Sequence, residues 1–276
     1  MNAVQQLYYY RKSLSTKTYQ SRGYRVIRCE LCRLAQTHCI CQFAPTASTI
    51  KRMTAEESKC SAGFLLLMHD TEVLKPSNTG KLIADLVNET YAFLWSRTVP
   101  NPELLAVLND PQWQPFVVFP SQYAEQGREV INEKVVCSDG KRPLFIMLDG
   151  SWREAKKMFR KSPYLAGFSI VSFDPQQQLT QLDNNEQHTS RYQIRIAHVD
   201  NQFATAEVAA RVLSMAGEHH KAHLLDLWFD VFSYQYQKSV CQTNKGNPQA
   251  IEHYQAYIAQ IKSNQIKSNQ IKLTNR

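Results

Sequence analysis

The sequence is poor in glycine, and its few glycines do not form nucleotide-binding patterns. Only nine of its 276 residues are glycine. No three of them match the G-x-G-x-x-G pattern of dinucleotide-binding loops, and the G-x-x-x-x-G-K-[ST] pattern of phosphate-binding loops is absent. These absences exclude the common glycine-rich nucleotide-binding loops, so a nucleotide-like ligand would have to be held by other loops.

Long apolar segments are also missing. The longest apolar run, Gly63–Met68, is far shorter than the roughly 18 residues of a membrane-spanning helix. The first residues are polar and basic, without the apolar segment of a secretory signal. We therefore expect a cytoplasmic protein with no membrane partner.

Positive charge is concentrated at one end of the chain. The 32 Lys and Arg residues exceed the 24 Asp and Glu residues, for a formal net charge of +8. Residues 1–60 hold ten of the bases and three of the acids, a net of +7, so the remainder is almost neutral. A basic segment ahead of a neutral body is typical of proteins that bind a polyanion, most often a nucleic acid. The alternative is a basic segment that is merely solvated.

Four of the seven cysteines lie close together, as Cys29-x-x-Cys32 and Cys39-x-Cys41. Disulfides are not expected in the cytoplasm, and thiolates are soft ligands that suit a tetrahedral Zn²⁺. Four sulfurs leave no open coordination position, so the predicted site is structural and would order a segment too polar to fold alone. Unligated thiols, a redox pair and an iron–sulfur cluster are the alternatives.

Apolar runs and amphipathic stretches alternate after residue 62, which predicts an α/β fold with a mainly parallel sheet. The predicted strands are residues 63–68, 116–119, 143–148, 168–173 and 192–196. The predicted helices are residues 80–87, 152–159, 206–215 and 221–238.

The sequence predicts three parts. Residues 1–60 form the basic N-terminal segment with the cysteine cluster, and residues 61–240 form the α/β domain. Residues 241–276 form a polar tail in which Ile-Lys-Ser-Asn-Gln occurs twice in tandem. We expect this tail to be a frayed helix or disordered.

Three loops follow predicted strands, at the edge of the sheet where open α/β folds bind ligands. The first ends in Ser77-Asn-Thr-Gly80, whose hydroxyls, amide and N–H groups would suit an anion or simply cap a helix. In the second, Asp149 leaves a buried strand, which suits proton abstraction or a helix cap. In the third, Arg191 and Arg195 could face phosphates, and Thr205 could bind a ligand or cap its helix.

Five features, in the same order along the chain, resemble the DTW-domain family. Asp149-Gly-Ser-Trp152 is similar to the Asp-x-Thr-Trp signature of that family, with Ser151 keeping the hydroxyl of the usual Thr. The other four are the cysteine cluster, Ser77-Asn-Thr-Gly80, Ser162-Pro-Tyr-Leu165 and Thr205-x-Glu207. The resemblance covers about residues 25–235 and points to the bacterial tRNA-uridine aminocarboxypropyltransferases.

This resemblance implies a reaction, a fold and partners. The enzyme would transfer the 3-amino-3-carboxypropyl group of S-adenosylmethionine to N3 of a tRNA uridine, usually in the variable loop, and release methylthioadenosine. The fold would be a SPOUT-like, knotted α/β domain with an N-terminal Cys₄ zinc segment. One alternative is an S-adenosylmethionine-dependent enzyme that acts on ribosomal RNA or transfers a methyl group. Another is a non-enzymatic, zinc-stabilised RNA-binding protein.

The resemblance also assigns roles to residues. Asp149 is the expected base that removes the N3 proton. Trp152 would stack on a base, form a wall of the pocket or pack in the core. The residues expected at S-adenosylmethionine are Ser77, Asn78, Thr79, Gly80, Ser151, Trp152, Leu165 and Thr205. The expected Zn²⁺ ligands are Cys29, Cys32, Cys39 and Cys41. The residues expected to bind tRNA are Arg25, Arg28, Arg33, Lys75, Lys156, Arg191 and Arg195.

Overall fold

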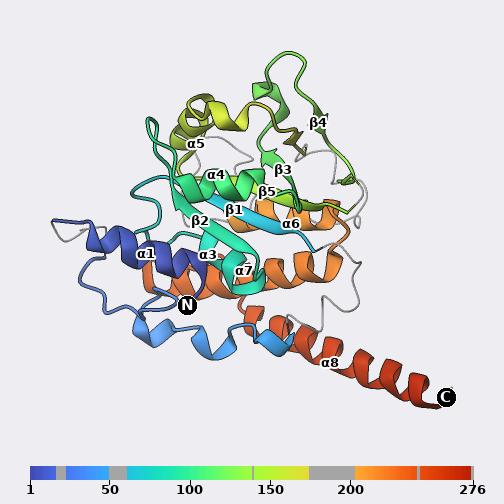
Figure 1. The fold of residues 1–276 in the computed structure, drawn as a ribbon. Helices are drawn as coiled ribbons and strands as arrows, with labels where there is room; N and C mark the ends of the chain where they lie inside the picture. Colours follow the sequence, from blue (N-terminus) through green and yellow to red (C-terminus); the bar gives the residue numbers. More distant parts are fainter. Residues whose placement is uncertain (17–22, 50–60, 139, 174–202, 241–242, 275–276) are drawn as a thin grey trace.

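A parallel β-sheet with helices on both faces forms the centre of the protein (Figure 1). The computed structural model describes residues 1–16, 23–49, 61–138, 140–173, 203–240 and 243–274. In this part of the chain no helix is both long enough and apolar enough to cross a membrane.

Six strands make up the sheet in the described part of the chain. They are β1 (Gly63–Met68), β2 (Thr90–Leu94), β3 (Trp113–Val118), β4 (Val130–Ile131), β5 (Arg142–Asp149) and β6 (Ile170–Val171). All run parallel in the order β2-β1-β5-β3-β6-β4. Their carboxyl ends therefore lie along one edge, and Asp149 at the end of β5 is in register with Met68 at the end of β1.

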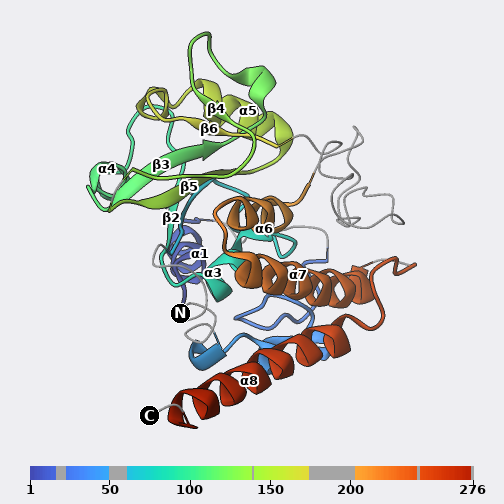
Figure 2. The same cartoon turned by 90° about the vertical axis from the view of Figure 1, so that its right-hand side faces the viewer.

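Helices cover the two faces of the sheet. The α-helices are α1 (Ala3–Ser13), α3 (Gly80–Leu86), α4 (Pro102–Asn109), α5 (Trp152–Arg160), α6 (Thr205–Met215), α7 (His219–Val240) and α8 (Ala250–Thr274). Short 3₁₀ helices are η1 (Gln36–His38), η2 (Cys41–Phe43), η3 (Ser121–Tyr123) and η4 (Pro163–Leu165). Helices α4 and α5 lie on one face, and α1, α3, α6 and α7 lie on the other with α8 outside α7 (Figure 2).

Strand β1 is apolar at every position because both faces of the sheet are covered there. In β1, Phe64 and Leu66 belong to the core under α3, α6 and α7, whereas Leu65 and Leu67 belong to the core under α4 and α5. A strand buried on both faces reads as a continuous apolar run rather than an alternating one. The run at residues 63–68 thus produces the strand that it predicts.

The structure confirms the predicted fold class: a mixed α/β fold whose sheet is entirely parallel and flanked by helices. The strand predicted at 168–173 is reduced to β6, and β2 and α4 were not predicted. The strand predicted at 192–196 lies outside the described residues. The knotted connection implied by the resemblance stays a prediction.

The two ends of the chain are more ordered than the sequence suggests. The N-terminal residues form α1, which a capping box at Asn2 and Gln5 begins. The tail forms the helix α8, whose residues Ala250, Tyr254 and Ile261 are buried in the core beside α7. A spaced set of apolar residues therefore docks the first part of this polar helix.

A substitution at Gly63 would test how tightly β1 is packed against Trp113. A Cβ atom at this residue would lie 2.6 Å from the ring of the buried Trp113. We expect Gly63→Ala to lower the free energy of unfolding by about 1–3 kcal/mol, because the buried Trp113 ring would have to shift to make room for the added methyl group. The matched control is Gly167→Ala, where an added Cβ meets nothing within 4 Å; it should change stability by no more than about 0.5 kcal/mol. Urea unfolding of both variants would measure this, and equal midpoints would contradict it.

Candidate active site and metal centre

The four clustered cysteines form a compact set of sulfurs. The Sγ atoms of Cys29, Cys32, Cys39 and Cys41 all lie within 4.8 Å of one another. The Cys29–Cys41 and Cys32–Cys39 pairs are 3.6 and 3.8 Å apart. Tetrahedral Zn²⁺ with Zn–S bonds of about 2.3 Å requires S–S distances of about 3.8 Å. The cluster could therefore hold a metal ion, and its all-sulfur donor set is consistent with zinc.

Titration of these thiols also favours a metal. Burial would raise the pKa of Cys29, but hydrogen bonds from the backbone of Cys32 and Leu31 lower it to about 7. Burial raises the pKa of Cys32 and of Cys41, and charge on neighbouring thiolates raises both further. Ionisation of Cys32 and Cys41 next to other thiolates is therefore unfavourable unless a cation neutralises the charge.

Two buried cations fasten the cysteine cluster to the loop that carries Asn78. Arg33 has a left-handed backbone (φ 62°) and is only 6 % exposed, and its guanidinium donates to the carbonyl of Val73. Lys81, at the start of α3, donates to the carbonyls of Cys32 and Pro76. Burial lowers the pKa of Arg33 to about 10. Burial, with the nearby charge of Arg33, also lowers the pKa of Lys81.

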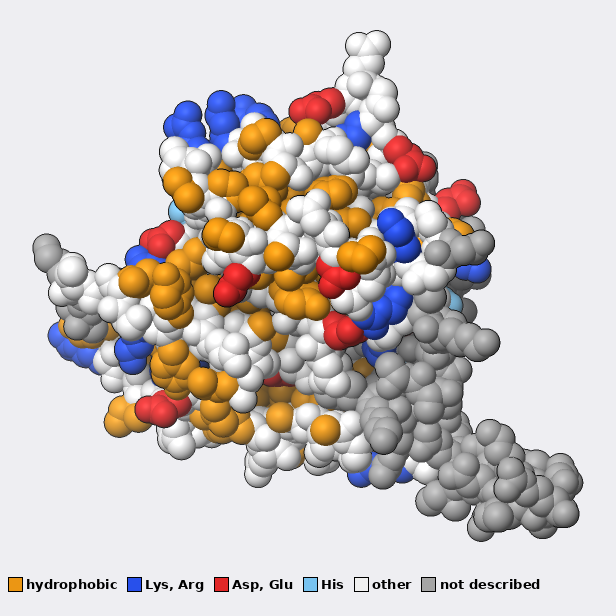
Figure 3. All heavy atoms as spheres, viewed as in Figure 1, with side chains coloured by type: hydrophobic (Ala, Val, Ile, Leu, Met, Phe, Trp, Pro, Cys, Tyr) orange, Lys and Arg blue, Asp and Glu red, His pale blue; other side chains and the backbone are white. Residues whose placement is uncertain are grey.

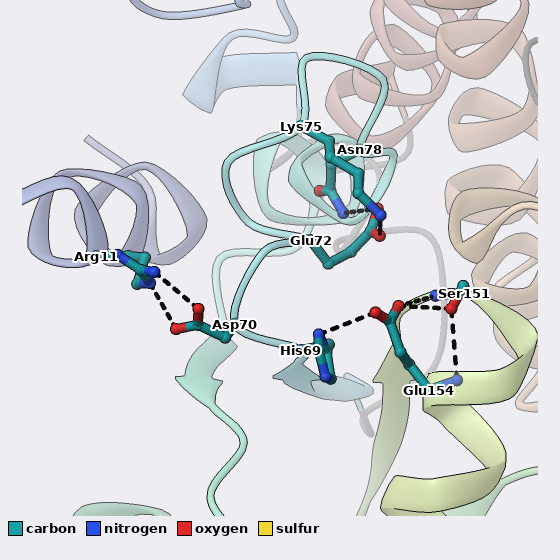
Figure 4. Close-up of polar contacts among 8 residues, drawn as sticks. All are labelled: Arg11, His69, Asp70, Glu72, Lys75, Asn78, Ser151 and Glu154. Atoms are coloured by element: carbon teal, nitrogen blue, oxygen red, sulfur yellow. Dashed lines mark hydrogen bonds and ion pairs between the residues drawn. The ribbon is translucent and has the colours of Figure 1, made fainter. Parts of the chain in front are cut away.

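The same loop is held from α1 and within itself. Arg11 donates two hydrogen bonds to the carboxylate of Asp70, at 2.5 and 2.7 Å (Figure 4). Lys75 Nζ lies 2.7 Å from Oε2 of the buried Glu72. The loop after β1 is thus held by α1 through Arg11, by the cysteine segment through Arg33 and by the start of α3 through Lys81.

Asp149 is the centre of a buried polar cluster at the carboxyl edge of the sheet. It is 2 % exposed, and each of its oxygens accepts a hydrogen bond. Asn78 Nδ2 donates to Oδ2 at 2.7 Å, and Thr205 Oγ1 donates to Oδ1 at 2.8 Å. A Cβ atom on Gly80 would lie 2.7 Å from Oδ2, so only glycine lets the first turn of α3 come this close.

Asn78 leaves a hydrogen-bond acceptor unused. Its amide nitrogen faces Asp149 and also lies 3.5 Å from Glu72 Oε1, which fixes the orientation of the amide. Its Oδ1 atom is buried and has no hydrogen-bond partner in the described part of the chain. A buried acceptor of this kind is costly unless a ligand N–H or O–H group completes it.

A second polar group lies at the start of α5. His69 Nδ1 is 3.2 Å from Glu154 Oε1, and Glu154 Oε2 accepts hydrogen bonds from Ser151 Oγ and N–H (Figure 4). Burial would raise the pKa of Glu154, but these hydrogen bonds, together with the neighbouring His69 and Lys75, hold that pKa below its ordinary value. Ser151 thus caps α5 in this structure.

The residues expected at S-adenosylmethionine fall into two groups. Around Asp149 lie Ser77, Asn78, Thr79, Gly80 and Thr205. Ser151, Trp152 and Leu165 lie on the side of the sheet that carries α5. Trp152 stacks on Phe119, with ring centroids 5.5 Å apart, and Leu165 is buried beside them. Both groups have members at the carboxyl end of β5, where Asp149 lies and Ser151 and Trp152 follow.

The sequence left the roles of Thr205 and Trp152 open. Thr205 does not cap α6: Ala204 is the N-cap residue, and its N–H is bound by Glu207 Oε2 at 2.8 Å. The Thr205 hydroxyl is therefore available to hold Asp149. Trp152 packs against Phe119 at the edge of the core. Because it is only half-buried, its exposed part could still line a pocket.

The cations expected to bind tRNA are not all at the surface. Arg25 is exposed, and Arg28 donates to the backbone carbonyl of Arg33 at 3.3 Å. Arg33 is buried. Its guanidinium donates a hydrogen bond to a carbonyl of the loop after β1 and lies 4.8 Å from the ring of Tyr8. Lys75 pairs with Glu72, and Lys156 is half-buried beside Trp152. Arg191 and Arg195 lie outside the described residues.

Three site residues were not predicted: His69, Glu72 and Glu154. The first two stand in the His-Asp-Thr-Glu stretch that follows β1 directly, so their position after a buried strand was a usable signal. Glu154 is the third helical residue of α5, where a capping-box Glu is common. Its contact with His69 is tertiary and has no sequence signature.

Zinc content tests the metal centre. We expect purified protein to contain about one Zn²⁺ per chain, and Cys32→Ser to lose most of it and to unfold at a lower temperature. Cys137→Ser is the control, since Cys137 lies outside the cluster, and it should keep the metal. Elemental analysis that finds no zinc, or iron with sulfide, would contradict the assignment.

No solved structure matches this chain. The family model described as DTW domain matches residues 26–237, which include the cysteine cluster, the Asn78 loop, Asp149 and Thr205. This range agrees with the resemblance inferred from the motifs, and the family is associated with tRNA-modifying enzymes. The chain belongs to the DTW domain family.

Proposed function

We propose that this protein is a tRNA-uridine aminocarboxypropyltransferase that acts in the cytoplasm. It transfers the 3-amino-3-carboxypropyl group of S-adenosylmethionine to N3 of a tRNA uridine, in the variable loop, and releases methylthioadenosine. The family supports tRNA modification as the reaction class. The observation that carries the finer proposal is Asp149, buried and held through both oxygens by Asn78 and Thr205.

Asp149 is the base in this proposal. A carboxylate has about four acceptor sites, so the two hydrogen bonds from Asn78 and Thr205 do not by themselves use up its capacity to take a proton. The uridine N3–H proton passes to Asp149, and the N3 electron pair forms the bond to the carbon next to sulfur. The carbon–sulfur pair stays on sulfur, which leaves as a neutral thioether.

The residues around Asp149 fit an amino acid group. S-adenosylmethionine supplies a carbon on a positively charged sulfur, which is a good leaving group, so the protein mainly has to orient the two reactants. The unpartnered Oδ1 of Asn78 suits an ammonium N–H of the transferred group. The bare Cα of Gly80 leaves room beside Asp149, and Trp152 and Leu165 form an apolar wall on the other side.

The cysteine segment acts as a support in this proposal. Arg33 and Lys81 connect it to the Asn78 loop, so a metal that orders the cysteines also holds Asn78 in place against Asp149. A Cys₄ site without an open position is suited to this structural role.

Nucleoside mass spectrometry tests the reaction. After incubation of unmodified tRNA with the protein and S-adenosylmethionine, we expect a uridine that carries the aminocarboxypropyl group, together with methylthioadenosine. A methyl adduct would show that the methyl group is transferred instead. No adduct would favour a non-enzymatic RNA-binding protein, and an adduct on ribosomal RNA alone would change the substrate.

A variant tests the base. We expect Asp149→Asn to lower the rate of transfer by about 10²–10⁴-fold, because the amide cannot take the N3 proton. Calorimetry with S-adenosylmethionine separates this loss from loss of the donor. Asp110→Asn, at a half-buried carboxylate after α4 and outside the candidate site, is the matched control and should keep the wild-type rate. Full activity in Asp149→Asn would sink the assignment.

A further inference from the structure

Helix α5 presents a row of cations to solvent. Arg153, Lys156, Lys157 and Arg160 lie at positions i, i+3, i+4 and i+7, which share one face of a helix, and Lys161 follows them. All are exposed except Lys156, which is half-buried. Figure 3 shows a cluster of Lys and Arg side chains over α5, at the upper left.

These charges are not balanced within the described part of the protein. None of the five cations pairs there with a carboxylate, and Glu154, the one acid of α5, faces Ser151 and His69. Like charges three and four residues apart repel each other on a helix. The helix dipole favours cations in the last turn but disfavours Arg153 in the first. Helix stability alone therefore does not account for the row.

The row lies next to the candidate active site. Helix α5 begins three residues after Asp149, and Lys156 and Lys157 lie over the indole rings of Trp152 and Trp95, 5.7 and 5.6 Å from the ring centroids. Trp95 follows the carboxyl end of β2 and stacks on His69. Lys156 and Lys157 thus pack on aromatic rings at the same edge of the sheet as the Asp149 cluster.

We propose that this face of α5 binds the phosphates of the RNA backbone beside the uridine that enters the site. The inference rests on the proposed function for the identity of the partner. Flexible cations without carboxylate partners are the usual contacts for phosphates. A helix that lies on a membrane would expose large apolar residues next to its cations, but Ala155 and Met158 are buried and Phe159 packs under the helix. Charge and position therefore favour RNA over a lipid surface.

This assignment places the main RNA contacts on α5 rather than on the N-terminal segment. The charge of residues 1–60 suggested that the N-terminal segment holds RNA, but Arg11, Arg28 and Arg33 of that segment serve internal contacts. Helix α5 belongs to the nearly neutral body and carries a local excess of cations that the total charge conceals.

Two four-residue variants test the surface. One replaces Arg153, Lys156, Lys157 and Arg160 by Gln. The other replaces Lys134, Lys238, Lys245 and Lys262 by Gln, which removes the same charge from exposed positions elsewhere. Binding of unmodified tRNA is measured by fluorescence anisotropy over a series of salt concentrations. We expect the α5 variant to bind at least about ten-fold more weakly near 0.1 M salt, with a slope of log K against log salt that is smaller by about 2–4.

The control variant should bind tRNA within about two-fold of wild type. Both variants should keep the wild-type melting temperature and affinity for S-adenosylmethionine, which shows that they fold. Equal loss of tRNA affinity in both would overturn the proposal, since total charge rather than α5 would then hold RNA. Binding of wild type to anionic phospholipid vesicles but not to tRNA would overturn it too.

Nucleoside analysis keeps this inference separate from the proposed reaction. If wild type forms the adduct and the α5 variant binds tRNA normally, the surface is wrong and the reaction stands. If wild type forms no adduct but its tRNA affinity depends on α5, the reaction is wrong and the surface stands.

Discussion

The candidate site depends on the burial of two positive charges, Arg33 and Lys81. A buried cation is unfavourable unless its donors are satisfied, and here backbone carbonyls of Val73, Cys32 and Pro76 accept them. These carbonyls belong to the cysteine segment and to the loop after β1, so satisfying the cations joins the two. The charge of Arg33 is also stabilised by the Tyr8 ring and by the more distant carboxylates of the Asp149 region.

Glycine is scarce in this chain, and two of its glycines allow close approaches that other residues would prevent. Gly63 lies against the Trp113 ring at the start of the central strand β1, and Gly80 lies against the Asp149 carboxylate. Neither has a positive φ, so each is needed for space rather than for backbone conformation. Gly80 lets an asparagine from one loop and a threonine from α6 share a single carboxylate. The absence of glycine-rich loops therefore does not prevent a polar ligand site, because single glycines provide the room.

The Lys and Arg side chains of this protein have two different roles, one in the fold and one at the surface. In the N-terminal segment Arg11, Arg28 and Arg33 complete hydrogen bonds to a carboxylate and to carbonyls, so part of the local excess of +7 stabilises the fold. In α5 the cations have no carboxylate partners in the described structure and face solvent. A count along the sequence cannot separate these cases, because it does not show which cations are enclosed by other segments. Added salt should affect the two groups of cations differently. Contacts between exposed cations and a polyanion weaken steeply as the salt concentration rises, whereas contacts of buried cations are screened little.

Local chemistry determined much of this protein. Apolar runs long enough for one strand predicted β1 and β5, the cysteine spacing predicted the sulfur cluster, and the DTW motifs predicted the family. Strand β2 was missed because an edge strand is only half-buried and its sequence lacks a clear pattern, whereas the Asn101-Pro102 start of α4 was a signal that could have been used. Only the tertiary structure decided that Arg33 is buried, that Thr205 holds Asp149, and that His69 and Glu154 meet. These contacts join residues from distant parts of the chain, so their energies depend on the packing of whole elements and leave no local pattern in the sequence.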